Sequence, residues 1–215
     1  MIPTVDDIIS ASGFHPSRVF CVYIFGSRVY GTAQSNSDWD IIMIANNSVD
    51  STELPGLKKG MFNIHVYTPK KFQEDLDWHR INNLECIFAP DWAKLKEDRK
   101  WNFKLELPKL RHAISHISSN SWVKAKKKLE QGDYYIGIKS LFHSIRIPMF
   151  GVQIAVLGEI KDFTVANYIW DDLTFKNLPH YMRDKSNWNW EELDKKWRPT
   201  LNETLTKFRA VAAKD

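Results

Sequence analysis

The sequence predicts an α+β protein in which a small mixed β-sheet with packed helices is followed by an all-helical part. Three apolar segments rich in β-branched and aromatic residues lie within the first 70 residues, as expected for buried strands. After Pro90 no further segment has a convincing strand pattern, and helical patterns follow instead. A chain of 215 residues suits one large or two small domains. We therefore predict a first domain over 1–100 and a second over 101–215.

The N-terminal half is predicted to combine short helices with strands. Thr4 is placed to cap a helix over 4–12, and Gly13 is placed to end it. The segment VFCVYIF (19–25) is a buried strand whose apolar run stops at Gly26-Ser27. The remaining predicted elements are a short helix or turn over 27–33, strands over 39–45 and 61–67, a loop over 46–55, a helix over 69–88, and a charged connector or short helix over 91–104.

The C-terminal half is predicted to be helical. Asn120 and Gly132 separate the first three helices, and Pro148 should kink or interrupt the third. The predicted helices span 105–117, 121–131, 133–157 and 190–210.

The composition excludes several classes of protein. With 43% hydrophobic and 26% charged residues the chain can bury a core, which excludes wholesale disorder. Cys21 and Cys86 are too few for a metal cage or a disulfide framework, which favours a reducing compartment. No apolar run approaches the ~20 residues of a membrane span, and the N-terminus lacks a signal pattern. We expect a cytoplasmic protein without a membrane partner, whose net charge of +4 suits an anionic ligand.

The stretch from Gly26-Ser27 to Asp38-Trp39-Asp40 combines residues that suit phosphoryl transfer. A glycine after a buried strand allows a tight turn and a close approach of the backbone, and the adjacent serine offers a hydroxyl and amide groups to a phosphate. Residues i and i+2 of a strand share one face, so the carboxylates of Asp38 and Asp40 can reach one point. Carboxylates that converge in this way can bind Mg²⁺ together with waters and substrate phosphates.

This stretch resembles the signature of the DNA polymerase β-like nucleotidyltransferase superfamily, and GSRVYGTAQSNSDWDI is most similar to its minimal nucleotidyltransferases. The resemblance covers about residues 20–90. It implies that Gly26 and Ser27 hold the triphosphate of an NTP, with Arg28 near enough to assist. It also implies that Asp38 and Asp40 bind catalytic Mg²⁺ or Mn²⁺.

The sequence departs from the superfamily pattern at a third carboxylate, which active members usually carry on a later strand. Here that strand reads MFNIHVY, and Asn63 or His65 stands at the matching position. Asn63 can ligate Mg²⁺ through its carbonyl oxygen and His65 can act as a base. Glu53 or Glu85 are alternative sources of the missing acid. The departure bears on catalysis more than on nucleotide binding.

In the helical half, cationic side chains recur at helical spacing, so that they can share one face. By resemblance, such a helical domain would close the nucleotide cleft and grip the triphosphate. The candidates are Ser121, Lys124, Lys128 and Lys139, with His143 and Arg146 one and two turns beyond Lys139.

The sequence leaves three functional hypotheses. The first is an enzyme that transfers a nucleoside monophosphate from an NTP to a hydroxyl of an RNA, a protein or a small molecule. The second is an NTP-binding or regulatory module with impaired catalysis. The third rests on Arg111 and His116, whose Arg-x4-His spacing is similar to that of HEPN-type ribonucleases, with the nucleotidyltransferase-like domain as an accessory.

Overall fold

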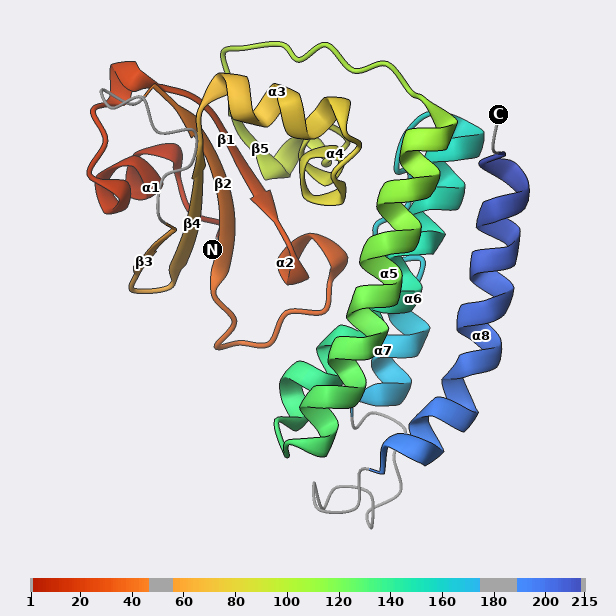
Figure 1. The fold of residues 1–215 in the computed structure, drawn as a ribbon. Coiled ribbons are helices and arrows are strands. Elements are labelled where there is room, and N and C mark those ends of the chain that lie inside the picture. Colours follow the sequence, from red (N-terminus) through yellow and green to blue (C-terminus); the bar gives the residue numbers. More distant parts are fainter. Residues whose placement is uncertain (1, 47–55, 175–188, 214–215) are drawn as a thin grey trace. The chain divides into compact units, whose positions relative to one another are not determined.

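The computed structural model describes residues 2–46, 56–174 and 189–213. The chain divides into two compact units, Met1–Lys104 and Leu105–Asp215. The first unit holds a five-stranded mixed sheet with helices, and the second holds long helices (Figure 1). The predicted α+β fold class is therefore confirmed.

The sheet of the first unit has the strand order β3-β4-β2-β1-β5. Its central strand β2 runs antiparallel to β1 and parallel to β4, while β3 and β5 are antiparallel edge strands. The strands β1, β2 and β4 have the bounds that the apolar segments predict to within one residue. The bounds are β1 Val19–Phe25, β2 Trp39–Ala45, β3 Leu57–Lys59, β4 Phe62–Tyr67 and β5 Lys94–Glu97.

Four α-helices accompany the sheet. Thr4 caps α1 through a reciprocal capping box with Asp7, and Gly13 ends the helix in the left-handed conformation, as predicted. Helix α3 contacts β2, and α4 contacts β1. The ring of Phe72 in α3 also stacks on that of Tyr23 in β1. The helices are α1 Val5–Ser12, α2 Ser27–Tyr30, α3 Pro69–Asp77 and α4 Ile81–Ile87, with 3₁₀ turns at Pro16–Arg18 and Asp91–Ala93.

Three predictions for the first unit are wrong. The helix predicted over 69–88 is two helices, because the chain turns at His79, which has a φ of 56°. The strands β3 and β5 were not predicted. Their sequences LKK and KLKE lack an apolar pattern because each lies at an edge of the sheet and pairs through its backbone with one neighbour.

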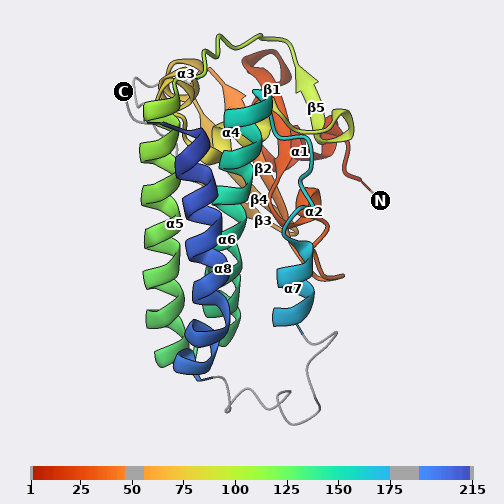
Figure 2. The ribbon, with the colours of Figure 1, turned by 90° about the vertical axis from the view of Figure 1, so that its right-hand side faces the viewer.

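The second unit is built on three long helices that lie side by side (Figure 2). Helix α5 is continuous where two helices were predicted, because the residues flanking Asn120 are anchored in the unit. Ser118 donates a hydrogen bond to the carbonyl of Ser144 in α6, and Trp122 is buried. Pro148 lies inside α6, which continues past it. The helices are α5 Leu107–Glu130, α6 Tyr134–Leu157, α7 Asn167–Leu173 and α8 Trp190–Val211.

Helix α6 is long and apolar enough to cross a membrane by length and composition alone. However, 61% of its most apolar window is buried inside the unit, where it packs against α5 and α8. Core helices of helical domains have the same composition, so this burial favours a packing role.

Candidate functional site

One row of paired residues crosses four strands of the first unit, and it contains Asp40. Going from β1 through β2 and β4 to β3, the row reads Phe25, Asp40, Asn63 and Lys58. The Nδ2 amide of Asn63 donates a hydrogen bond of 2.8 Å to Oδ1 of Asp40. The register thus brings together the second aspartate of the motif and the asparagine that stands in place of a third acid.

Gly26 follows Phe25 at the end of β1 and lies against the other oxygen of the same carboxylate. Its backbone has φ 79° and ψ −153°, a conformation that is essentially restricted to glycine. A Cβ atom at this position would lie 2.7 Å from Oδ2 of Asp40. Glycine is therefore required both for the turn into α2 and for the approach to Asp40. Ser27 is the first residue of α2, immediately beyond this contact.

Asp38 lies just before β2 and forms an ion pair with Lys58 of β3, at 2.9 Å between Oδ2 and Nζ. The side chains of Lys58 and Asp38 are 70% and 38% exposed, so the pair contributes at most about 1 kcal/mol to stability. A weak, exposed pair leaves the carboxylate accessible to a stronger cation. Lys58 was not predicted from the sequence, although Gly60, which follows LKK, is typical of a hairpin turn.

Arg28 holds the polar segment that leads into β2. Its Nε donates to the carbonyl of Asp38 at 3.3 Å, and its Nη2 donates to the carbonyl of Ser37. The guanidinium also lies over the ring of Trp39, 3.9 Å from the centroid. Arg28 thereby positions the backbone of the two aspartates. Its predicted contact with phosphate stays a prediction.

The four candidates for a third acid or base occupy different places. Asn63 touches Asp40, as described above. His65 is exposed one step further along the same face of β4, where its ring meets Phe25 edge-on at 5.6 Å. Glu85 is buried in α4 and accepts a hydrogen bond from the hydroxyl of Tyr30 in α2. Glu53 lies outside the described residues.

Asp40 and Asn63 of the row, together with Asp38 just before β2, could hold a hard divalent cation with few protein ligands. Asp38 and Asp40 supply carboxylate oxygens, and Asn63 can supply an amide oxygen if its side chain turns over. Across residues 2–46, 56–174 and 189–213, no three His, Cys, Asp or Glu side chains gather to hold a metal ion. The donor set therefore fits Mg²⁺ or Mn²⁺ that keeps waters and substrate phosphates as its other ligands. It does not fit a cage made entirely by the protein.

In the second unit, the structure brings several of the predicted cations around His143 of α6. Desolvation lowers the pKa of this imidazole well below its usual value of 6.5, and the positive charges of Arg146, Lys139 and Lys124 lower it further. Arg146 is buried, and its Nε donates a hydrogen bond of 3.2 Å to Nδ1 of His143. A neutral imidazole surrounded by cations is a favourable environment for an anion.

The two other predicted residues of this group differ in charge environment. Lys128 forms an ion pair of 3.0 Å with Asp133, which offsets its charge. Ser121 is half-buried on α5, one helical turn before Lys124. Contact of Ser121, Lys124, Lys128 or Lys139 with a triphosphate stays a prediction.

Comparison with known proteins gives one match to a family. Residues 12–91 match the family model described as Polymerase beta, Nucleotidyltransferase. This range includes Gly26, Ser27, Asp38, Asp40 and Asn63. No curated protein sequence matches the chain.

Two solved structures are distantly similar. Spectinomycin adenyltransferase AAD(9) from Enterococcus faecialis, solved with ATP and spectinomycin, is 12% identical with a TM-score of 0.48, over 96% of this chain and 100% of that chain. A nucleotidyltransferase-like protein from Exiguobacterium sibiricum is 12% identical with a TM-score of 0.27, over 97% of this chain and 73% of that chain. Similarity at this level assigns no substrate.

We predict that Gly26→Ala strongly reduces binding of Mg²⁺–NTP, because the new Cβ would displace the Asp40 carboxylate and the backbone conformation excludes alanine. Thermal melting with and without Mg²⁺ and an NTP measures the effect. The control is Gly13→Ala, at φ 75° with no atom within 4 Å of the added Cβ. It should cost about 1–2 kcal/mol of stability without changing the ligand response. Equal ligand responses of the two variants would contradict the prediction.

We predict that stability falls as the pH is lowered below 6.5, partly through His143. The folded state disfavours the protonated imidazole. The neutral His143 therefore contributes fully to the free energy of unfolding above pH 6.5, and this contribution is lost as the pH falls toward the lowered folded-state pKa. Urea unfolding at pH 7.5 and 5.5 should therefore show that the free energy of unfolding falls less in His143→Gln than in the wild type. His112→Gln, at an exposed position, is the control. A loss in His143→Gln as large as that of the wild type would refute the assignment.

Proposed function

We propose that the protein transfers a nucleoside monophosphate from an NTP to a hydroxyl group of an acceptor, because residues 12–91 match the Polymerase beta, Nucleotidyltransferase family model. The acceptor oxygen attacks the α-phosphorus, the bond between the α-phosphorus and the bridging oxygen breaks, and pyrophosphate leaves. The hydroxyl proton passes to a basic group or to water. The observation that carries this proposal is the placement of the Asp40 carboxylate between Gly26 and Asn63.

The residues of the row act by positioning and by charge. The amide of Asn63 fixes Oδ1 of Asp40, and the backbone of Gly26 lies against Oδ2, so the carboxylate is oriented before a ligand arrives. Asp38 supplies the second carboxylate. A Mg²⁺ or Mn²⁺ ion held by these two residues would offset the negative charge of the phosphates during transfer. Arg28 fixes the backbone at Asp38 by donating to the carbonyls of Ser37 and Asp38, and strand pairing fixes Asp40.

The cations around His143 are our candidates for neutralising the triphosphate. The positive charges of Arg146, Lys139 and Lys124 all lower the pKa of the His143 imidazole, which places three cationic side chains near one point. An NTP carries the complementary charge. That the helical half closes a nucleotide cleft stays a prediction, as do the cytoplasmic location and the identity of the acceptor.

A second function, NTP binding with little turnover, is favoured by one observation. Asn63 occupies the register position beside Asp40, where a third carboxylate would complete the site. An amide oxygen is a weaker ligand for a hard cation than a carboxylate, and it is no base. This alternative shares the fold and the ligand with the first and differs only in the rate of transfer.

We predict that Asp38→Asn combined with Asp40→Asn lowers nucleotide transfer at least about 100-fold, because the charge that attracts the metal and orients the phosphates is removed. Incubation with each of the four NTPs labelled at the α-phosphate, together with pyrophosphate detection, measures transfer to the protein itself and to cellular RNA. Asp6→Asn, an exposed change in the first turn of α1, is the control. Transfer at the wild-type rate by the double variant would exclude this site.

We predict that Asn63→Asp increases the stabilisation of the protein by Mg²⁺, because a third carboxylate would join the row. Without metal the variant should be less stable than the wild type, since it loses the hydrogen bond to Asp40 and gains like-charge repulsion. Melting across a Mg²⁺ titration, with pyrophosphate release in parallel, measures both effects. Asn63→Ala loses the same hydrogen bond without adding charge. Equal responses of these two variants to Mg²⁺ would show that the row is no metal site.

A further inference from the structure

A polar groove lies within the helical unit, between α5 and α8. None of its lining residues is assigned to the proposed transfer. It has a volume of about 870 Å³. Residues at i, i+3, i+4 and i+7 usually form the apolar face of a helix, yet here nearly all of that stripe of α5 is polar. The lining residues are Pro108, Arg111, His112, Ser115, His116, Ser119 and Asn120 of α5 and Arg209 of α8.

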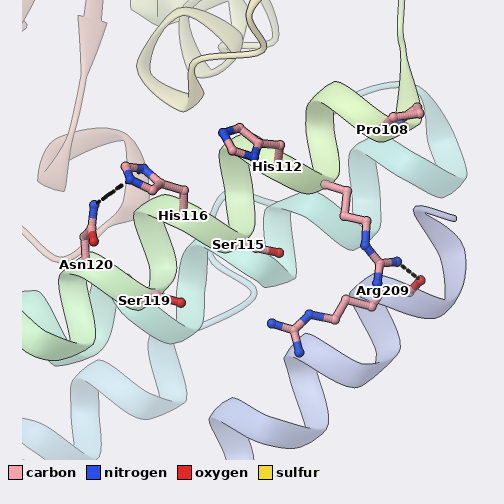
Figure 3. A pocket seen from close by; sticks show the side chains of 8 residues that line it. Pro108, His112, Ser115, His116, Ser119, Asn120 and Arg209 are labelled. Atoms are coloured by element: carbon pink, nitrogen blue, oxygen red, sulfur yellow. Dashed lines mark hydrogen bonds between the residues drawn. The ribbon is translucent and has the colours of Figure 1, made fainter. Parts of the chain in front are cut away.

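The charges of the groove favour an anion. Two of its eight lining residues are arginines, two are histidines, and none is acidic. Nη1 of Arg111 donates to the carbonyls of Arg209 and Ala212, which offsets the negative end of the α8 dipole. The exposed Arg209 side chain extends into the groove (Figure 3). Its guanidinium can therefore meet a phosphate.

The hydroxyl groups also point to a ligand. Ser115 and Ser119 project from α5 toward α8 (Figure 3). The Oγ atom of Ser115 is enclosed, and within the described part of the chain it has no hydrogen-bond partner. A solvent-sized group does not reach this atom, but the side chain of Ser119 is exposed, and its hydroxyl can donate to a ligand in the groove.

The flank of the groove offers surfaces for stacking. His112 and His116 are exposed, one helical turn apart, and their rings are nearly parallel with centroids 6.1 Å apart. Asn120 extends this flank and contacts His116. From Pro108 to Asn120 the stripe is about 18 Å long, longer than a single phosphate group needs. Sites for single-stranded nucleic acid usually combine arginines, which bind the phosphates, with aromatic rings, on which the bases stack.

We propose that this groove binds the phosphodiester backbone of a single-stranded nucleic acid, with Arg209 on a phosphate and His116 against a base. This site is separate from the Asp38–Asp40 row and does not depend on the proposed transfer. The strand can be RNA or DNA, which share the phosphodiester chemistry and differ in the 2′-hydroxyl.

The test is binding of a labelled 12-nucleotide single strand to the full-length protein, followed by fluorescence anisotropy. The protein carries Asp38→Asn and Asp40→Asn, and EDTA is present, so that strand binding at the metal row is suppressed and a failed transfer activity leaves the result unaffected. In this background Arg209→Gln should weaken binding about tenfold and reduce the slope of log K against log salt by about 0.7. His116→Ala should weaken binding by about 5-fold or more through lost stacking.

The matched control is Lys127→Gln, which removes one exposed positive charge from α5 outside the groove lining. It should leave the affinity within about twofold of the background protein. Stronger binding of RNA than of DNA of the same sequence would assign the strand as RNA, and equal binding would assign both. Three results would overturn the proposal: no binding at low salt, equal losses in Arg209→Gln and Lys127→Gln, or displacement of the strand by millimolar inorganic phosphate alone.

Discussion

The contact between Gly26 and the carboxylate of Asp40 is the constraint on which the site depends. After β1 the backbone of Gly26 turns into α2, and a Cβ atom on this backbone would lie 2.7 Å from Oδ2. The antiparallel pairing of β1 with β2 and the parallel pairing of β2 with β4 then align Asp40 with Asn63, whose amide holds the second oxygen. Two neighbouring strands thus orient the carboxylate of Asp40. Asp38 is positioned separately, because Arg28 donates a hydrogen bond to its backbone carbonyl.

The two units carry opposite charge chemistry. The sheet presents the carboxylates of Asp38 and Asp40, and the ion pair of Asp38 with Lys58 is exposed and weak. Helices α5 and α6 instead place positive side chains near His143, whose pKa is lowered by desolvation and by those charges. In the proposed function the carboxylates would attract the metal ion, and the positive side chains are candidates for the triphosphate. The groove between α5 and α8 is lined by two arginines and two histidines, which is the basis of the proposal that it binds an anionic strand.

In the proposed site, Asn63 is the residue that distinguishes NTP binding with little turnover from nucleotide transfer. As a hydrogen-bond donor it orients Asp40 without adding negative charge, which makes the row stable in the absence of metal. The same substitution of an amide for a carboxylate lowers the attraction for a divalent cation. In such a site Asp40 is well oriented, but the negative charge that attracts a metal ion is modest. The rate of nucleotide transfer would show whether this charge is sufficient for turnover.

The sequence by itself determined the elements whose cause is local. The strands β1, β2 and β4 follow from continuous or alternating apolar residues, and the cap of α1 follows from Thr4 and Gly13. The Gly-Ser and Asp-x-Asp pattern could also be identified from the sequence, because its residues lie close together along the chain. Tertiary structure alone decided the edge strands β3 and β5, the turn at His79 and the continuity of α5, because backbone pairing and distant packing override weak local preferences there. It also placed Asn63 and Lys58 in the Asp40 row and Glu85 in the core beside Tyr30. Strand register and burial arise from contacts between distant residues, which no local pattern encodes.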